Sequence, residues 1–263
     1  MGGGRPFHPL PQFPITPFAS TMKRRVESEL LDELPADDSG AVHSRRDLRL
    51  VNVLMGNVRA LASAAHSLFQ ERPPGGLVDL GAGDGTLMLR VARRLSRQWR
   101  NVKVELVDRQ GIVSAETCRR FEALSWQAEP VELDVFDWLS RPSSRRIDLI
   151  TANLFLHHFP NPTLARLMQL AAEQTNCFLA CEPRRCAAGL AASRALGLLG
   201  CNRVTRHDAV NSVRAGFRGR ELSALWPRKR DWRLQEQAVG LFGHCFVAQR
   251  LPQRSDASDG WAL

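Results

Sequence analysis

Apolar positions along the chain alternate between helical and strand spacing, which predicts repeated strand and helix units. Residues 45–68 carry apolar side chains on one helical face, and the apolar run 77–80 leads through a glycine-rich turn into helical spacing over 86–95. Further strands are predicted at 102–107, 131–133, 147–152 and 177–181, and further helices at 114–124, 162–174 and 187–199. Alternation of this kind predicts a parallel sheet.

Two more alternating segments, 232–239 and 242–249, meet at Gly240 and predict a terminal antiparallel pair. The segment 206–222 fits no regular period and is interpreted as an irregular segment, where binding residues often lie. The expected fold class is therefore α/β, with a Rossmann-like, seven-stranded, mostly parallel sheet that has a terminal antiparallel strand. Helices flank this sheet, and a helical extension precedes it.

The domain organisation follows from the same pattern. We expect a disordered leader over residues 1–22, an N-terminal helical lid over 23–72, one α/β domain over 73–252 and a flexible tail over 253–263. The leader is rich in Pro and Gly and contains no apolar core of signal-peptide length. Pro73 and Pro74 mark the boundary between the lid and the α/β domain.

The composition excludes some classes of protein but does not identify a binding partner. Hydrophobic residues make up 44% and charged residues 24%, and no apolar run is long enough to span a membrane, so a soluble protein is expected; the unpaired cysteines predict a cytoplasmic one. The six cysteines lack paired spacing and a nearby His pair, which predicts reduced thiols and no metal site. The net charge of +9 comes mostly from scattered Arg, so a nucleic-acid partner is not expected.

The glycine-rich turn VDLGAGDG, residues 78–85, is the motif that carries the chemistry. Glycines between a strand and a helix let the backbone approach a ligand closely, and the helix N-terminus favours a negative group. A nicotinamide fingerprint needs its third glycine at position 86, which is Thr86 here, so the dehydrogenase interpretation is weakened. The turn also lacks the Gly-Lys-Ser/Thr of a nucleoside triphosphate site.

The eight residues of this turn resemble the first motif of class I S-adenosylmethionine-dependent methyltransferases, which reads hydrophobic, acidic, hydrophobic, Gly-x-Gly-x-Gly. The resemblance implies that S-adenosyl-L-methionine is the cofactor. It also implies that Asp79 orients the loop and meets the ammonium of the methionine moiety, while Gly81, Gly83 and Gly85 give the cofactor room. Asp84 occupies a variable position of the family and is assigned no role.

Further cofactor-binding residues are expected at the ends of successive strands. Asp108 ends the second strand about twenty residues after the glycine turn, where a carboxylate accepts hydrogen bonds from both ribose hydroxyls. The resemblance places the adenine amino group at Asp134, beside Val135, with Asp137 as the competing assignment. Asn153, after the fourth strand, completes the expected set.

The segment NLFLHHF, residues 153–159, lacks the motifs of DNA base methyltransferases and resembles enzymes that methylate small molecules. If the acceptor is a phenol, whose pKa is about 10, a general base assists the transfer. The candidates are His157, His158 and His207. Adjacent side chains point in different directions, so at most one of the His pair is expected to face the cofactor, and His158 is favoured. The alternative is that the His pair packs beneath the cofactor; no pairing of His207 with Asp208 is expected.

Residues 44–57 and 206–222 are similar to bacterial methyltransferases related to quinone-biosynthesis enzymes, some of them found near type III polyketide synthases. This narrower resemblance implies a small aromatic or polyketide-like acceptor, methylated on oxygen or less readily on carbon, beneath a lid that carries Leu54 and Met55. Arg214, Arg218 and Arg220 are either contacts for an anionic acceptor or a solvated face. A protein or RNA methyltransferase and a nicotinamide-dependent oxidoreductase are the alternative functions, and the oligomeric state is left open.

Overall fold

The computed structural model describes residues 22–252 except 36, 71 and 143–145, so the tail and all of the leader except Met22 lie outside the described residues. The described chain forms a seven-stranded sheet in the order β3-β2-β1-β4-β5-β7-β6. Strands β1 to β5 are parallel, and β7 is antiparallel to both of its neighbours. The expected fold class is confirmed. The strands are β1 (Leu77–Leu80), β2 (Val102–Asp108), β3 (Trp126–Glu132), β4 (Ile147–Asn153), β5 (Thr175–Pro183), β6 (Trp232–Val239) and β7 (Gly243–Arg250).

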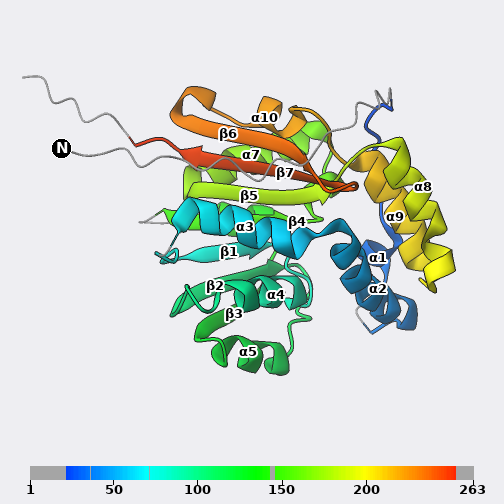
Figure 1. The fold of residues 1–263 in the computed structure, drawn as a ribbon, viewed down its shortest axis with the longest axis horizontal. Helices are drawn as coiled ribbons and strands as arrows, with labels where there is room; N and C mark the ends of the chain where they lie inside the picture. Colours follow the sequence, from blue (N-terminus) through cyan, green and yellow to red (C-terminus); the bar gives the residue numbers. More distant parts are fainter. Residues whose placement is uncertain (1–21, 36, 71, 143–145, 253–263) are drawn as a thin grey trace, which may run out of the picture.

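Helices cover both faces of the sheet (Figure 1). The helices α3 (Asn57–Phe69), α4 (Thr86–Leu95) and α5 (Ala115–Glu122) enclose one apolar core with the sheet, and α6 (Val135–Leu139), α7 (Asn161–Gln174) and α10 (Glu221–Leu225) enclose the other. Because β1 and β5 lie between both layers, nearly all of their side chains are buried. Parallel strands of this kind are near-continuous apolar runs in the sequence, which is why their positions were predictable.

The strand predicted at 131–133 is longer than the sequence pattern indicates. β3 begins at Trp126 and lies at the edge of the sheet, where most of its side chains are at least partly exposed. Pro130 is tolerated there because an edge strand has backbone groups that need no ladder partner. The apolar pattern therefore marks only the last part of this strand.

The single helix predicted over 45–68 is wrong, because Gly56 divides it. Gly56 adopts a left-handed conformation, φ +71°, which ends α2 (Ser39–Met55) in the way typical of a glycine after a helix. α3 then packs on the sheet, while α2 turns away from it (Figure 1). The helical spacing of apolar residues continues from α2 into α3, although the two helices cover different parts of the molecule.

The interpretation of 206–222 as irregular is also wrong. A regular helix, α9 (Arg203–Ala215), occupies most of it, and the Asn202 side chain caps this helix by accepting a hydrogen bond from the Thr205 amide at 2.8 Å. The buried face of α9 consists of Thr205, Asp208, Asn211 and Ala215. Three of these four residues are polar, so an apolar periodicity does not reveal the helix.

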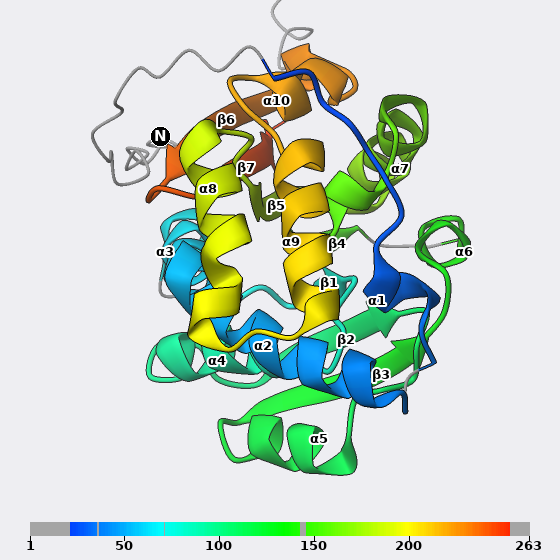
Figure 2. The ribbon, with the colours of Figure 1, turned by 90° about the vertical axis from the view of Figure 1, so that its right-hand side faces the viewer.

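Four helices gather at the carboxyl ends of the parallel strands, as Figure 2 shows. They are α1 (Leu30–Glu33), α2, α8 (Ala187–Ala195) and α9, and we call residues 22–55 and 187–215 the cap. The Asp208 carboxylate accepts the amides of Leu30 and Leu31 at 2.8 and 3.0 Å, which joins α1 to α9. No helix of the described residues is long and apolar enough to cross a membrane.

The segment before α1 is held across this end of the sheet by Arg24. Its guanidinium donates to the carbonyls of Ala215, His157 and Phe159 and to the Asn161 side chain, at 2.7 to 3.2 Å. The chain therefore passes from Met22 to α1 directly above the loop that follows β4.

Candidate active site

The glycine-rich turn between β1 and α4 has a conformation that few other residues adopt. Gly81, Gly83 and Gly85 have φ values of +67°, +55° and +71°. A Cβ at Gly81 would lie 2.3 Å from the Phe155 ring, whereas one at Gly83 would meet no atom within 4 Å. The turn is therefore closed on the side of Phe155 and open at Gly83, where a ligand has access to the backbone.

A cavity of about 180 Å³ lies beside this turn, beneath α2. The structure brings together in its wall five of the eight predicted cofactor-binding residues: Asp79, Gly81, Gly83, Asp108 and Asn153. Gln110 also lines it and was not predicted. This wall is built from the carboxyl ends of β1, β2 and β4, where open α/β sheets bind their ligands.

The carboxylates of Asp108 and Asp79 both line this cavity but differ in their burial and their hydrogen-bond partners. The Asp108 oxygens accept the amides of Gly83 at 2.8 Å and Gln110 at 2.9 Å, and each oxygen keeps a further lone pair for a ligand. Asp79 is buried and accepts the Thr151 hydroxyl at 2.7 Å. Burial raises the pKa of Asp79 to about 7 against the opposing effect of the Thr151 hydrogen bond.

Asn153 leaves an acceptor unsatisfied in the same wall. Its amide nitrogen donates to Asn52 Oδ1 at 3.1 Å, but its own Oδ1 is buried without a hydrogen-bond partner. A buried orphan acceptor costs on the order of 1–3 kcal/mol. A ligand that offers a donor here would recover that cost, so the residues present fit a polar group such as the ribose or the amino acid part of S-adenosylmethionine.

The other three predicted cofactor-binding residues do not reach this cavity wall. Asp134 is exposed and caps α6 by accepting the Phe136 amide at 2.7 Å, and Val135 packs in the core. Gly85 precedes α4 and faces Leu106. In the structure these three residues contact neighbouring protein groups.

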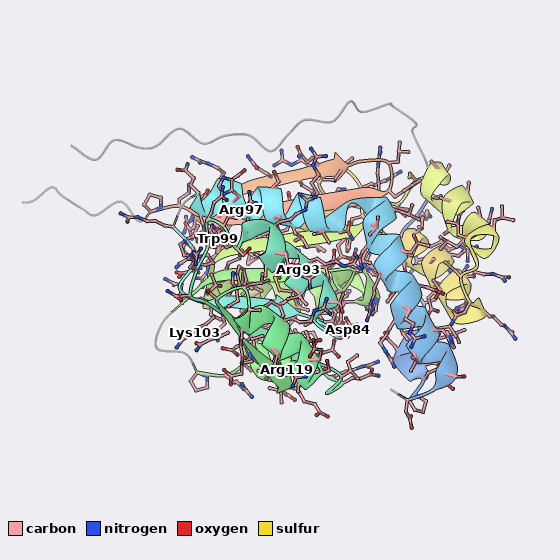
Figure 3. The ribbon with its side chains drawn as sticks, turned by 60° about the horizontal axis from the view of Figure 1, so that its bottom comes forward. Asp84, Arg93, Arg97, Trp99, Lys103 and Arg119 are labelled. Carbon is pink, nitrogen blue, oxygen red and sulfur yellow. The ribbon has the colours of Figure 1, made fainter. Side chains whose placement is uncertain are left out.

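Asp84, to which the sequence assigned no role, joins the glycine turn to the cap. Its carboxylate accepts the Thr86 amide and forms an ion pair of 2.8 Å with Arg49 of α2. In Figure 3 Asp84 lies beside α2, whereas Arg97 and Lys103 lie toward the opposite end of the sheet. The ion pair closes one side of the first cavity.

A second cavity, of about 380 Å³, lies between the cap and the loop after β4. Four residues line both cavities: Leu31, Asp32, Leu48 and Leu154. Leu54 and Met55 line the second, together with other apolar side chains of α2, α8 and α9. The described residues of its wall include Glu29, Asp32 and Asp208 but no Lys or Arg, so Arg214, Arg218 and Arg220 do not contribute to it.

Both His157 and His158 line this second cavity, and neither lies in the described wall of the first. They belong to the 3-10 turn η1 (Leu156–His158). His157 Nδ1 is 2.7 Å from Glu182 and Nε2 is 3.2 Å from Glu29. His158 Nδ1 is 3.0 Å from Asp32 and Nε2 is 3.5 Å from Glu29.

His207 is not brought to this cluster. It is about half exposed, lies outside the described walls of both cavities, and its ring nitrogen is 2.9 Å from Asp208 Oδ1. The prediction that the adjacent residues do not pair is therefore wrong. Neighbouring side chains can meet when the second one turns back toward the first.

The charges of the buried pair Glu29 and His157 stabilise each other. Burial alone lowers the pKa of His157, but hydrogen bonds and charge interactions with Glu182 and Glu29 raise it to about 9. Burial alone raises the pKa of Glu29, and the contacts with His157 outweigh this and lower it to about 2. At neutral pH the His157 ring is therefore charged, and its two N–H groups donate to Glu182 and to Glu29.

Glu182 holds the turn that carries both histidines. Its fully buried carboxylate accepts the amides of Phe155 and Leu156 at 3.1 and 2.9 Å, in addition to the His157 ring. Sequence analysis missed Glu182, Glu29 and Asp32. A carboxylate at the end of the apolar run 177–181 was the available signal, because a charge in such a place needs partners.

Replacing Glu182 with Ala should lower the free energy of unfolding by about 3–5 kcal/mol, because it leaves a buried cation and two buried amides without their acceptor. Urea denaturation measures this loss. The exposed Glu173 of α7 is the matched control, and Glu173→Ala should change the stability by less than about 0.5 kcal/mol. Equal stabilities of the two variants would contradict the role of Glu182.

The comparisons with known proteins agree with this architecture. The family model described as a methyltransferase domain matches residues 53–236. The plantazolicin methyltransferase BpumL, in complex with a triazolic desmethylPZN analog and SAH, is 12% identical, with 84% of this chain and 93% of that chain covered and a TM-score of 0.58. An O-methyltransferase family protein from Burkholderia thailandensis is 17% identical, with coverages of 84% and 65% and a TM-score of 0.53.

A third similar structure is magnesium protoporphyrin IX methyltransferase from Synechocystis PCC 6803 with bound SAM. It is 13% identical, with 82% of this chain and 88% of that chain covered and a TM-score of 0.50. At such identities the likeness concerns the fold alone. The search of curated proteins gave no match.

Proposed function

The chain belongs to the methyltransferase domain family, and from this premise we propose that it transfers a methyl group from S-adenosylmethionine to an oxygen of a small, uncharged aromatic acceptor. One observation carries the proposal: a polar cavity at the glycine turn and a larger apolar cavity share a wall that includes Leu31 and Leu154. Methyl transfer is an in-line displacement, and its rate depends on holding the two reactants in contact and aligned. Adjacent cavities meet that requirement.

The residues proposed to hold the cofactor are those of the first cavity. Asp79 would meet the ammonium of the methionine moiety, Asp108 the ribose hydroxyls, and Asn153 Oδ1 a donor of the ligand. Gly83 would leave room for the cofactor beside the backbone. When bound, the cofactor supplies a methyl group activated on a sulfonium.

The second cavity is proposed to hold the acceptor. Its apolar walls favour an aromatic or polyketide-like molecule, and its acidic side chains, with no Lys or Arg among the described residues of the wall, disfavour an anion. The interpretation of Arg214, Arg218 and Arg220 as acceptor contacts is therefore not retained. Family membership disfavours a nicotinamide-dependent oxidoreductase, and the apolar lining of the cavity makes an RNA or protein acceptor the less favoured alternative.

His158 is proposed as the catalytic residue of the acceptor cavity. Its ring lines the cavity, is 23% exposed, and is oriented by Asp32, so that the acceptor hydroxyl can lose its proton at this cluster. Within residues 23–72, α1 and α2 are proposed as the lid over both cavities, whereas α3 belongs to the packed core.

The affinity for S-adenosylhomocysteine should depend on the ionisation of Asp79. Its pKa of about 7 in the free protein means that the carboxyl is neutral at lower pH, whereas the ligand ammonium favours the charged form. The affinity should therefore rise by about tenfold per pH unit up to pH 7 and fall again above about pH 8, where the ligand amine loses its proton. Calorimetric titration between pH 5.5 and 9 measures this profile.

Two variants separate the assigned contacts in the same titration. Asp79→Asn should abolish the rise below pH 7. Asp108→Ala should keep the rise but weaken binding throughout, by about 1.5–3 kcal/mol for the lost charge-assisted hydrogen bonds. An Asp79→Asn profile that matches the unmodified protein would remove Asp79 from the cofactor site.

Replacing His158 with Ala should lower kcat for a neutral phenol by about 10²-fold or more and leave the affinity for S-adenosylhomocysteine unchanged. The measurement is methyl transfer to a series of phenols at saturating S-adenosylmethionine. His207→Ala, at the remaining sequence-predicted candidate, should retain the turnover. Retained turnover in His158→Ala would exclude His158 as a catalytic residue.

A further inference from the structure

The histidine cluster has the composition and spacing of a metal site. Glu29, His157 and His158 each offer one potential ligand atom, and these atoms all lie within 4.8 Å of one another. The two ring atoms nearest Glu29 are Nε2 of His157, at 3.2 Å, and Nε2 of His158, at 3.5 Å. A carboxylate and two imidazoles that converge in this way form the ligand set of many divalent transition-metal sites.

The other nitrogen of each ring has the partner that metal-binding histidines usually have. His157 Nδ1 is 2.7 Å from the Glu182 carboxylate, and His158 Nδ1 is 3.0 Å from the Asp32 carboxylate. An Nδ1–H donated to a carboxylate fixes the ring and makes Nε2 a better donor to a metal. Such partners on both rings are an observation independent of the spacing of the three ligands.

The charges of the cluster also favour a cation. Glu29, Asp32 and Glu182 bring three carboxylates to two imidazoles; His157 and Glu182 are almost completely buried, and the Glu29 side chain is 12% exposed. Buried carboxylates require a compensating positive charge nearby. A single dication between the three ligands would supply this charge without rearranging the Glu182 and Asp32 contacts.

We propose that Glu29, His157 and His158 bind one divalent first-row transition-metal ion at the wall of the acceptor cavity, with a coordination position open to the acceptor. Imidazole ligands suit Zn²⁺ and Fe²⁺, and the carboxylate of Glu29 also suits Mn²⁺, whereas Mg²⁺ prefers oxygen ligands and retained water. Glu29 precedes α1, so the ion would also link the cap to η1.

This site deepens the proposed function and rests on it for its chemistry. The acceptor hydroxyl would bind at the open position, where the ion acts as a Lewis acid and the proton leaves to solvent. The resulting oxygen anion would form the new bond to the methyl carbon as the carbon–sulfur bond breaks and its electron pair stays on sulfur. His158 then acts as a ligand, and Asp32 as the residue that positions it.

The test is calorimetric titration of the full chain, after treatment with a chelator, with Zn²⁺, Mn²⁺ and Mg²⁺ separately. Because Cys118 is a partly exposed thiol that competes for Zn²⁺, the series uses the Cys118→Ser background. One equivalent of Zn²⁺ and of Mn²⁺ should bind, and Mg²⁺ should bind at least 100-fold more weakly. Glu29→Gln and His158→Ala should each weaken Mn²⁺ binding by at least 100-fold, and Asp32→Asn by about 10–100-fold.

His207→Ala is the matched control and should bind Mn²⁺ as the background protein does, since His207 lies outside the cluster. An unchanged far-UV circular dichroism spectrum establishes that each variant is folded. Absence of Zn²⁺ and Mn²⁺ binding at about 1 mM would overturn the metal site. So would Mn²⁺ affinities of Glu29→Gln and His158→Ala that equal the affinity of the background protein.

The two proposals fail in different ways. Full methyl transfer by the chelator-treated protein would overturn the metal site and leave the methyltransferase function intact. Absence of both S-adenosylhomocysteine binding and methyl transfer would overturn the function, while the stoichiometry of Mn²⁺ and its loss in Glu29→Gln would still decide whether the site exists.

Discussion

The buried carboxylate of Glu182 is the contact on which the arrangement of the site depends. It ends β5 and holds the loop after β4 through two backbone amides and the His157 ring. This contact supports Leu154 in a left-handed conformation, φ +50°, a backbone state that costs a non-glycine residue about 1–2 kcal/mol. Leu154 forms part of the wall between the cavities, and the next residue, Phe155, closes the glycine turn at Gly81.

The cap is attached to the two cavities by contacts of unequal strength. On the side of the glycine turn, the Arg49–Asp84 pair has side chains 48% and 29% exposed, and such pairs contribute at most about 1 kcal/mol. On the acceptor side, Glu29 and Asp32 join a cluster that is mostly buried, and Asp208 holds the start of α1. The cap is therefore anchored at the histidines and only weakly attached above the glycine turn.

The sequence was sufficient to predict the fold. Buried parallel strands are continuous apolar runs, and the turn after β1 requires glycines because its backbone has positive φ, so both features can be recognised in the sequence. It was insufficient at Gly56, since helical spacing continues through the break, and at α9, whose buried face is polar. Asp79, predicted from the glycine motif, and Asp108 and Asn153, predicted from their places at strand ends, all line the first cavity. The partners of the histidines were not predictable, because Glu29 and Glu182 are more than 150 residues apart and meet only through the cap. The resemblance also predicted Asp134 as a site residue; its side chain caps α6 and lies outside the described wall of the first cavity.

The most direct test of the two-cavity account is a crystal structure of the protein with S-adenosylhomocysteine and a neutral phenol bound together. The account predicts the ribose at Asp108, the thioether sulfur at the wall formed by Leu31 and Leu154, and the phenol oxygen facing that sulfur from the side of His158. A phenol bound outside the apolar cavity, or a cofactor bound away from the glycine turn, would contradict it.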